Sequence, residues 1–413
     1  MPGVEFDKKK DTQRKGIEPT QVKSIKLLTP LDNGSANESG EKNRTKTQPG
    51  MVFGKTYKFK VDAYTNLPPQ DKKKIKWKYK YHSLSQNKWI EYTSKITGEE
   101  YGLVMNEKDM CGRTLHVMAY INDDESEGYL KVWCHNRFRW FNRSIFEAEL
   151  KERTEDKKPW KVNQSSTSLC GMACIFYIFA KEQPDAYKKF AKELFRTGEA
   201  THNSYTAKPS EELFEKKINT RGYPMDTGSM PLIDFVTMAG TRNTDNPKYK
   251  GGNEEFQAIN WPWVMKNLSS KLLGYSDVKD RGIYNPIKSS TGLINVEKKL
   301  AEIDNYYKQG YKVILMIDSD LIQDIFDLKS VDYHWIVYEG GLSVDAPNYT
   351  IKKYFEDLIM FDVFSWGCNP KDKREKKIDQ NNQSVINDEQ GYLRKKISIN
   401  HFNLNYYGYL ICK

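Results

Sequence analysis

The sequence predicts an α+β protein with an N-terminal β-sandwich, and three observations along its 413 residues support this. Short segments that alternate between apolar and polar residues fill roughly the first third of the chain. Apolar residues at helical spacing follow from about residue 150 onward. Strand-like apolar runs then close the chain, including KVILMI at 312–317 and HWIVYEG at 334–340. Helices followed by strands that can pair antiparallel are typical of an α+β domain.

The N-terminal region is predicted to hold the sandwich at 21–149, after a polar, disordered tail at 1–20. Tyr57, Phe59 and Val61 alternate with lysines, so one face of this strand should be buried and the other solvated. Residues 32–50 have the composition of a loop or linker. The strand candidates are VKSIKLL, KTYKFKVDAY, KIKWKYKYHS, KWIEYT, TLHVMAYI and GYLKVWCH.

The second predicted domain spans 150–413 and starts with helices. The run GMACIFYIFAK, from Gly171, is apolar on nearly all sides, which predicts a helix in the centre of a domain. An amphipathic helix should begin at Pro184 and end at Gly198. Further helices are expected at 231–240, 262–273 and 296–309, and the segments LIMFDVFSW and NYYGYLIC should complete the sheet. Residues 369–391 are predicted to form a solvated loop.

Composition excludes several classes of function. No window approaches about 18 uninterrupted apolar residues, so no membrane span is expected, and the first residues lack the apolar core of a signal peptide. The six cysteines have neither zinc-site nor disulfide-scaffold spacing, so we expect reduced thiols and no metal or organic cofactor. The net charge of +10 comes from basic residues mixed with acids, which does not favour specific nucleic-acid binding.

A cysteine, a histidine and a glutamine form the candidate catalytic group. Cys170 directly precedes the buried helix, where unpaired amides and the helix dipole favour a thiolate. Gln164, six residues earlier, could donate to an oxyanion. His334 opens a predicted strand, which would hold its imidazole as base and then acid. The alternatives are that Cys170 is a buried core thiol, that Gln164 caps the helix, and that His401 is the catalytic histidine instead of His334.

This order of Gln, Cys at a helix start and His at a strand start resembles the papain-like cysteine peptidases. The CGMAC segment is similar to bacterial bacteriocin-processing members, and FSWG at 364–367 is similar to the Ser-Trp-Gly that follows the orienting Asn in papain. Phe364 replaces that Asn, so another group must orient the histidine. Asp345, in VDAP, resembles the Asp-Pro of the processing peptidases and is preferred. Asp362, which would share the strand face of Phe364, is the other candidate.

Residues 155–367 also resemble papain-like toxin domains of bacterial contact-dependent and type VI secretion effectors, and 21–149 is similar to modules that precede such toxins in Bacteroidetes. The resemblance implies a protease delivered without a signal peptide from the producer's cytoplasm into a target bacterium. It further implies a protein substrate, a cognate immunity protein and a spike or tube component that contacts the N-terminal domain. Peptidoglycan amidase, deamidase or transglutaminase chemistry, and a non-enzymatic component of a secretion apparatus, are the alternatives.

Overall fold

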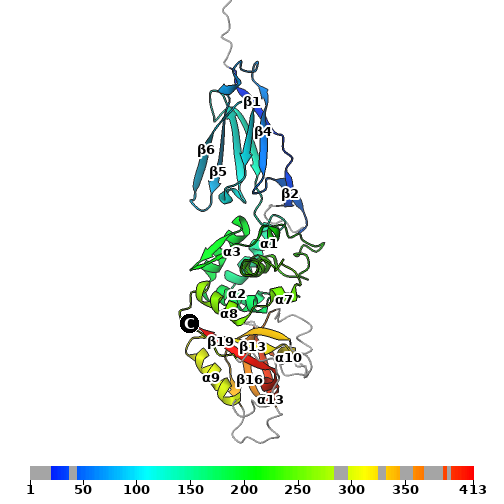
Figure 1. Cartoon of the computed structure of the whole chain (residues 1–413), viewed down its shortest axis with the longest axis vertical. Coiled ribbons are helices and arrows are strands. Elements are labelled where there is room, and N and C mark those ends of the chain that lie inside the picture. The colour runs from blue at the N-terminus through cyan, green and yellow to red at the C-terminus, as the bar shows by residue number, and fades with distance from the viewer. Residues whose placement is uncertain are drawn as a thin grey trace, which may run out of the picture. The chain divides into compact units, whose positions relative to one another are not determined.

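The computed structural model describes residues 20–36, 44–282, 296–323, 332–344, 357–366, 385–387 and 392–413. The described chain is a mixed α+β protein with several antiparallel sheets (Figure 1). It divides into two compact units, one formed by residues 1–32 and 49–135 and the other by 33–48 and 136–413. No helix within the described ranges is long and apolar enough to cross a membrane.

Two antiparallel sheets of the first unit share one hydrophobic core. Their strand orders are β1-β4-β7 and β6-β5-β8-β9. On β4 the rings of Tyr57 and Phe59 are buried and Lys58 is exposed, which confirms the predicted alternation. The bounds are β1 (Val22–Leu27), β4 (Thr56–Tyr64), β5 (Lys76–Ser83), β6 (Lys88–Thr97), β7 (Glu100–Val104), β8 (Thr114–Tyr120) and β9 (Gly128–Trp133), with 3-10 turns η1 (Lys72–Lys74) and η2 (Lys108–Met110).

The segment predicted as a loop at 32–50 contains two strands, β2 (Asp32–Ser35) and β3 (Thr47–Gly50), which pair with each other. Ser35 N–H donates to the carbonyl of Arg139, 2.6 Å away, so part of this segment belongs to the second unit. The units divide after residue 135, whereas the predicted boundary at 149 falls inside helix α1 (Arg143–Thr154). Pairing between residues a hundred positions apart leaves no local pattern that could have shown this.

The second unit contains an eight-stranded antiparallel sheet with the order β12-β19-β13-β14-β16-β18-β17, and β15 pairs with β16. The predicted strands at 312–317 and 334–340 correspond to β13 and β14. The bounds are β12 (Val278–Asp280), β13 (Lys312–Asp318), β14 (Tyr333–Tyr338), β15 (Ser343–Val344), β16 (Asp357–Phe364), β17 (Val385–Asn387), β18 (Tyr392–Ser398) and β19 (Tyr406–Cys412). Strands β10 (Ala200–His202) and β11 (Tyr205–Ala207) form a separate pair.

Helices precede and cover this sheet. Helix α2 (Cys170–Glu182) is buried from Cys170 to Ala180, as the apolar run predicts, and α3 (Pro184–Thr197) ends at Gly198 with a φ of 73°. The predicted helix at 231–240 consists of α5 (Leu232–Asp234), a π-helical turn η4 (Phe235–Ala239) and α6 (Gly240–Asp245). The others are η3 (Pro159–Lys161), α4 (Glu211–Phe214), α7 (Glu255–Ala258), α8 (Pro262–Lys271), α9 (Val296–Lys308), α10 (Asp320–Gln323) and α13 (Ile399–Asn405).

Both faces of the sheet are buried, and successive residues of each central strand enter different cores. On β13, Ile314 and Met316 pack with α2 and its neighbours, while Val313 and Leu315 pack in a second core that includes residues of α9 and α13. A strand covered on both faces appears in the sequence as a continuous apolar run. This confirms KVILMI as a buried strand (Figure 1).

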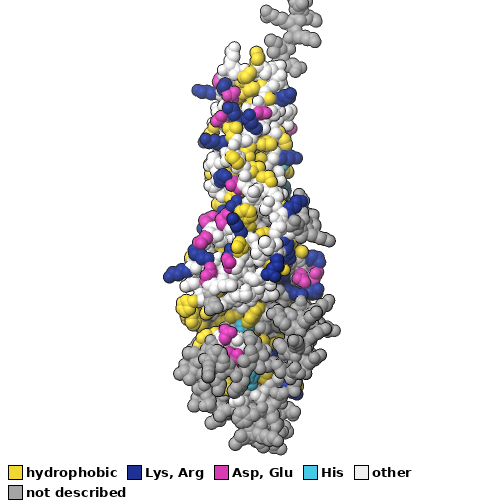
Figure 2. All heavy atoms as spheres, turned by 90° about the vertical axis from the view of Figure 1, so that its right-hand side faces the viewer, with side chains coloured by type: hydrophobic (Ala, Val, Ile, Leu, Met, Phe, Trp, Pro, Cys, Tyr) yellow, Lys and Arg dark blue, Asp and Glu magenta, His cyan; other side chains and the backbone are white. Residues whose placement is uncertain are grey.

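Charged side chains of both signs lie on the face of the molecule that Figure 2 shows. On the face drawn in Figure 2, Lys and Arg side chains lie among Asp and Glu side chains and do not gather into a patch of one sign. The sequence predicted this mixture from the way acids interrupt the basic residues.

One aromatic contact joins the helical core to the sheet. The rings of Tyr177, on α2, and Phe364, on β16, are stacked with centroids 3.8 Å apart and an interplanar angle of 4°. Both side chains are fully buried. Phe364 therefore packs in the core at the position where the resemblance to papain places an orienting Asn.

Phe364→Ala should lower the free energy of unfolding by about 3–5 kcal/mol, because it removes a buried ring and leaves a cavity. Urea unfolding followed by tryptophan fluorescence measures the change. Phe256→Ala is the matched control, because Phe256 is 70% exposed and its loss should change stability by no more than about 0.5 kcal/mol. Equal effects of the two substitutions would contradict the role of the stacked pair.

Candidate active site

A pocket of about 460 Å³ in the second unit brings together three of the five predicted site residues, Gln164, Cys170 and His334. The segment 164–170 forms one wall, residues 259–261 form another, and the ends of β13 and β14 complete it. The pocket therefore lies where the N-terminus of α2 meets the beginning of β14. Cys174, one turn later on α2, does not line this pocket and is a buried core thiol.

Cys170 is the first residue of α2 and is 7% exposed. Burial raises the pKa of its thiol to about 11, although backbone N–H groups, including that of Trp335, act to lower it. The negative charge of Asp332 raises it further. The pKa lowering that the helix terminus predicted is therefore outweighed by desolvation, and Cys170 is a thiol at neutral pH.

His334 is buried near the start of β14, and burial holds the pKa of its imidazole well below the usual value. Its Nε2 shares a 3.2 Å hydrogen bond with the hydroxyl of Ser365. The ring of Trp366 lies against the imidazole, with centroids 3.5 Å apart and an angle of 72° between the planes. Sequence reasoning missed Ser365, although FSWG was singled out, because it examined only the position of the absent Asn.

Of the two acidic residues predicted to orient His334, Asp362 lies away from the imidazole. The Asp362 carboxylate accepts a 3.0 Å hydrogen bond from Arg394, and its backbone pairs with Glu339 and Gly340 at the far end of β14 from His334. The assignment of Asp362 is therefore wrong, since antiparallel register runs β16 away from the start of β14. Asp345 lies outside the described residues.

The thiol and the imidazole share the pocket, but within the described structure no hydrogen bond joins them. Trp335 and Val337 pack toward α2, whereas Ile336 packs in the opposite core. Because side chains alternate along a strand, His334 lies on the same face of the sheet as Ile336. The sulfur of Cys170 accepts a hydrogen bond from the backbone N–H of Trp335. His401 hydrogen-bonds the carbonyl of Asp320 and is absent from the described lining.

Two buried carboxamides line the pocket beside Cys170. Gln164 Oε1 has no hydrogen-bond partner among the described residues, and the Gln164 carbonyl accepts from Thr167, which fixes the turn that leads to α2. Asn260 is 1% exposed, and neither amide atom has a partner within the described ranges. Its side chain packs against Gly171, where an added Cβ would lie 2.6 Å from that of Asn260. No motif in the sequence pointed to Asn260.

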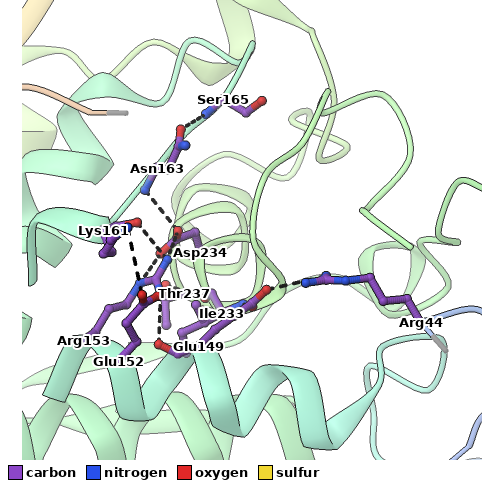
Figure 3. A network of polar contacts seen from close by, with 10 residues as sticks. All are labelled: Arg44, Glu149, Glu152, Arg153, Lys161, Asn163, Ser165, Ile233, Asp234 and Thr237. Atoms are coloured by element: carbon purple, nitrogen blue, oxygen red, sulfur yellow. Dashed lines mark hydrogen bonds and ion pairs between the residues drawn. The ribbon is translucent and has the colours of Figure 1, made fainter. Parts of the chain in front are cut away.

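A buried ion pair holds the loop that carries Gln164 (Figure 3). Arg153, on α1, contacts both carboxylate oxygens of Asp234, on α5, at 2.6 and 3.2 Å. Arg153 also donates to the carbonyl of Lys161, and Asp234 accepts the N–H of Asn163 at 3.0 Å. The Asn163 side chain in turn accepts the N–H of Ser165 at 2.7 Å. The backbone on both sides of Gln164 is therefore fixed by one network.

Glu149 lies in the same network, and its carboxyl group has a pKa near neutrality. It accepts the N–H of Ile233 at 3.1 Å and lies 3.6 Å from Arg44. Burial raises the pKa of this carboxyl to about 7, and the nearby charge of Arg153 opposes the shift. Although burial opposes the charge of Arg153, the neighbouring Asp234 carboxylate raises the pKa of its guanidinium, so the network keeps its cation.

No family model matches the chain, and no curated protein matches it. Among the described residues, no group of three or more His, Cys, Asp or Glu side chains could hold a metal ion. The chemistry that the pocket can perform therefore rests on Cys170, His334, Ser365 and the two carboxamides.

Asp234→Ala should lower the free energy of unfolding by about 3–5 kcal/mol, because it leaves the Arg153 guanidinium buried without its partner. It should also abolish hydrogen-exchange protection of the Asn163 amide. Urea unfolding and amide exchange measure the two effects. Arg153→Met combined with Asp234→Leu removes both charges and should recover most of the stability, so an equal loss in the single and double variants would contradict the assignment.

Alkylation of Cys170 by iodoacetamide should accelerate with pH toward an apparent pKa near 11. The folded chain holds this proton more tightly than the unfolded chain, so the thiol contributes stability below pH 9 that is lost as the pH rises toward 11. Mass spectrometry of a Cys368→Ser variant follows the reaction, because Cys368 lies outside the described residues. A rate that is already constant below pH 7 would instead show a preformed ion pair of thiolate and imidazolium.

Proposed function

We propose that the second unit is a papain-like cysteine peptidase. The observation that carries this proposal is the presence of Cys170, His334 and Gln164 in one pocket, at the point where a buried helix begins beside the first residues of a sheet strand. The order of these residues along the chain and the fully buried helix are the features shared with that family. The strand that begins next to His334, β14, belongs to an antiparallel sheet, which agrees with a papain-like arrangement.

In the proposed reaction the sulfur of Cys170 forms a bond to the carbonyl carbon of a peptide, and His334 accepts the thiol proton. The electron pair of the carbonyl moves to its oxygen, which the Gln164 amide stabilises. The C–N bond then breaks, and His334 gives its proton to the leaving amine. Water attacks the resulting thioester with His334 as base, which releases the acid and restores the thiol.

Ser365 and Trp366 act in this scheme as positioning residues. The Ser365 hydroxyl engages Nε2 of His334 and leaves Nδ1 for the proton transfer. Trp366 covers the imidazole and limits its contact with water. Both groups are neutral before reaction, because burial opposes each charge, so His334 must take the proton as the sulfur attacks. This differs from a peptidase that keeps its thiolate in a stored ion pair.

We further propose that this peptidase is an interbacterial toxin that cleaves a protein in the target cell and is neutralised by an immunity protein. The support is the resemblance of 155–367 to effector toxin domains. In the same proposal, the two sheets of the first unit form a β-sandwich that loads the toxin onto a secretion-system spike or tube component. A peptidoglycan amidase would use the same pocket residues against a periplasmic substrate.

One observation favours a second function, a binding component with a degenerate active site. Cys170 and His334 share no hydrogen bond within the described ranges, and burial makes the thiol a weaker acid than free cysteine. A chain that had lost catalysis could keep these residues for packing alone. The two functions differ in whether removing the sulfur or the imidazole has any effect beyond stability.

Expression of the full chain in the cytoplasm of a susceptible bacterium tests the proposal. Growth should stop with the wild type and continue with Cys170→Ala and with His334→Ala at matched protein levels. Cys174→Ala, one helical turn away, is the control and should remain toxic. Toxicity that survives both site substitutions would exclude the thiol mechanism.

The same variants exported to the periplasm separate the two substrates. Lysis only after export would identify an amidase, whereas arrest only in the cytoplasm agrees with a protease. Wild-type protein that is harmless in both compartments would favour the binding component.

A further inference from the structure

The charges of the pocket differ from those of the chain. The chain carries a net charge of +10, yet the described lining of the pocket contains one acidic side chain, Asp332, and no Lys or Arg. Asp332 is exposed, accepts a 2.8 Å hydrogen bond from the Ser319 hydroxyl, and acts on the titration of Cys170 through its charge. Burial keeps the imidazole of His334 neutral. The negative charge of Asp332 therefore acts on the Cys170 thiol without a compensating cation in the described lining.

A second and independent feature of the same pocket is the Asn260 side chain. A buried amide without partners costs about 1–3 kcal/mol per unsatisfied group, so a fold does not retain one without a reason. The Trp335 indole donates to the Asn260 carbonyl at 2.9 Å, which fixes Asn260 relative to the strand of His334. A carboxamide offers one acceptor and two donors, the set that pairs with a peptide group.

We propose that this pocket recognises a positively charged peptide, in which Asp332 binds a Lys or Arg side chain and Asn260 pairs with the neighbouring peptide group. The inference rests on the proposed peptidase function and specifies its substrate class. The acid attracts the cationic side chain and orients it beside the sulfur. Asn260 gains its missing hydrogen bonds only when the peptide is bound. The free-energy cost of removing its amide from water is already incurred in the free protein, so it does not weaken peptide binding.

Charged methanethiosulfonates test the electrostatic part on the full chain with Cys368→Ser. The Cys170 thiolate attacks the sulfenyl sulfur, forms a mixed disulfide and releases methanesulfinate, so neutral, trimethylammonium and sulfonate reagents differ only in the charge they bring. The cationic reagent should react about tenfold faster than the anionic one, relative to their rates with free cysteine. Asp332→Asn should bring this ratio close to one.

Asp226→Asn is the matched control, because Asp226 is exposed, lies outside the described lining, and has a φ of 62° that Asn also accepts. It should leave the ratio unchanged, and Asp332→Glu should retain the preference for the cation. A ratio that Asp332→Asn does not alter would overturn the role of Asp332. Loss of the Asp332 charge also changes the fraction of Cys170 that is thiolate. This change affects the rates with the cationic and anionic reagents equally, so it cancels in their ratio.

Peptidyl chloromethyl ketones test the recognition of the peptide. The thiolate displaces chloride, and a probe ending in lysine should alkylate Cys170 at least about tenfold faster than the matched norleucine probe. Asp332→Asn should remove this preference. Asn260→Leu should slow both peptide probes more than it slows the neutral methanethiosulfonate. It should also keep or raise the thermal unfolding midpoint, because it removes an unpartnered amide.

The outcomes separate this inference from the peptidase proposal. Alkylation of Cys170 by both peptide probes at equal rates would overturn the cationic subsite and leave the peptidase standing. Asn260→Leu that slows all reagents equally, or lowers the unfolding midpoint, would overturn peptide pairing by Asn260. A Cys170 that no peptide probe alkylates, with a methanethiosulfonate ratio that still depends on Asp332, would overturn the peptidase and retain only the charge selectivity.

Discussion

The buried ion pair between Arg153 and Asp234 is the constraint on which the pocket depends. Two charges removed from water are tolerated only when every remaining donor and lone pair is satisfied. Here the surplus hydrogen bonds go to the backbone at Lys161 and Asn163, so the requirement to satisfy the charges also fixes the loop that precedes Cys170 (Figure 3). Helix α1 and this loop are thereby held to helix α5, whose Asp234 lies 71 residues after Asn163. The backbone around Gln164 is positioned by this network, while Oε1 of its own side chain has no hydrogen-bond partner among the described residues.

A second constraint is the packing of the sheet on α2. Phe364 and Val337 are directly paired across β14 and β16, and both enter the core that contains α2. Because neighbouring residues of a strand point to opposite faces, Ser365 and His334 lie on the other side, and there the serine hydroxyl meets the imidazole. An aromatic residue at 364 therefore strengthens the contact between helix and sheet, while the polar partner of the histidine moves to the next residue. An Asn at 364 would place its amide against Tyr177 in an apolar core.

Burial affects the titration of both Cys170 and His334. Burial opposes the thiolate of Cys170 and the imidazolium of His334 alike, and Asp332 adds a negative field that a cation can offset. In our proposal, a cationic peptide supplies the charge that the pocket lacks, so recognition and activation of the thiol become coupled.

The sequence alone determined the elements and much of the candidate site. Local period and capping identified the alternating strand of Tyr57 and Phe59, the all-apolar helix α2, the end of α3 at Gly198 and the buried strand β13, because these features depend on near neighbours. The position of Cys170 at a helix start, of Gln164 six residues earlier and of His334 at the head of a predicted strand selected three residues that share one pocket.

Tertiary structure decided what depends on distant partners. Antiparallel register carried Asp362 away from His334, desolvation reversed the expected thiol pKa, and long-range packing placed Asn260 beside Cys170 and assigned residues 33–48 to the second unit. These outcomes depend on burial and on register between remote segments, and neither quantity is written in a local stretch of sequence.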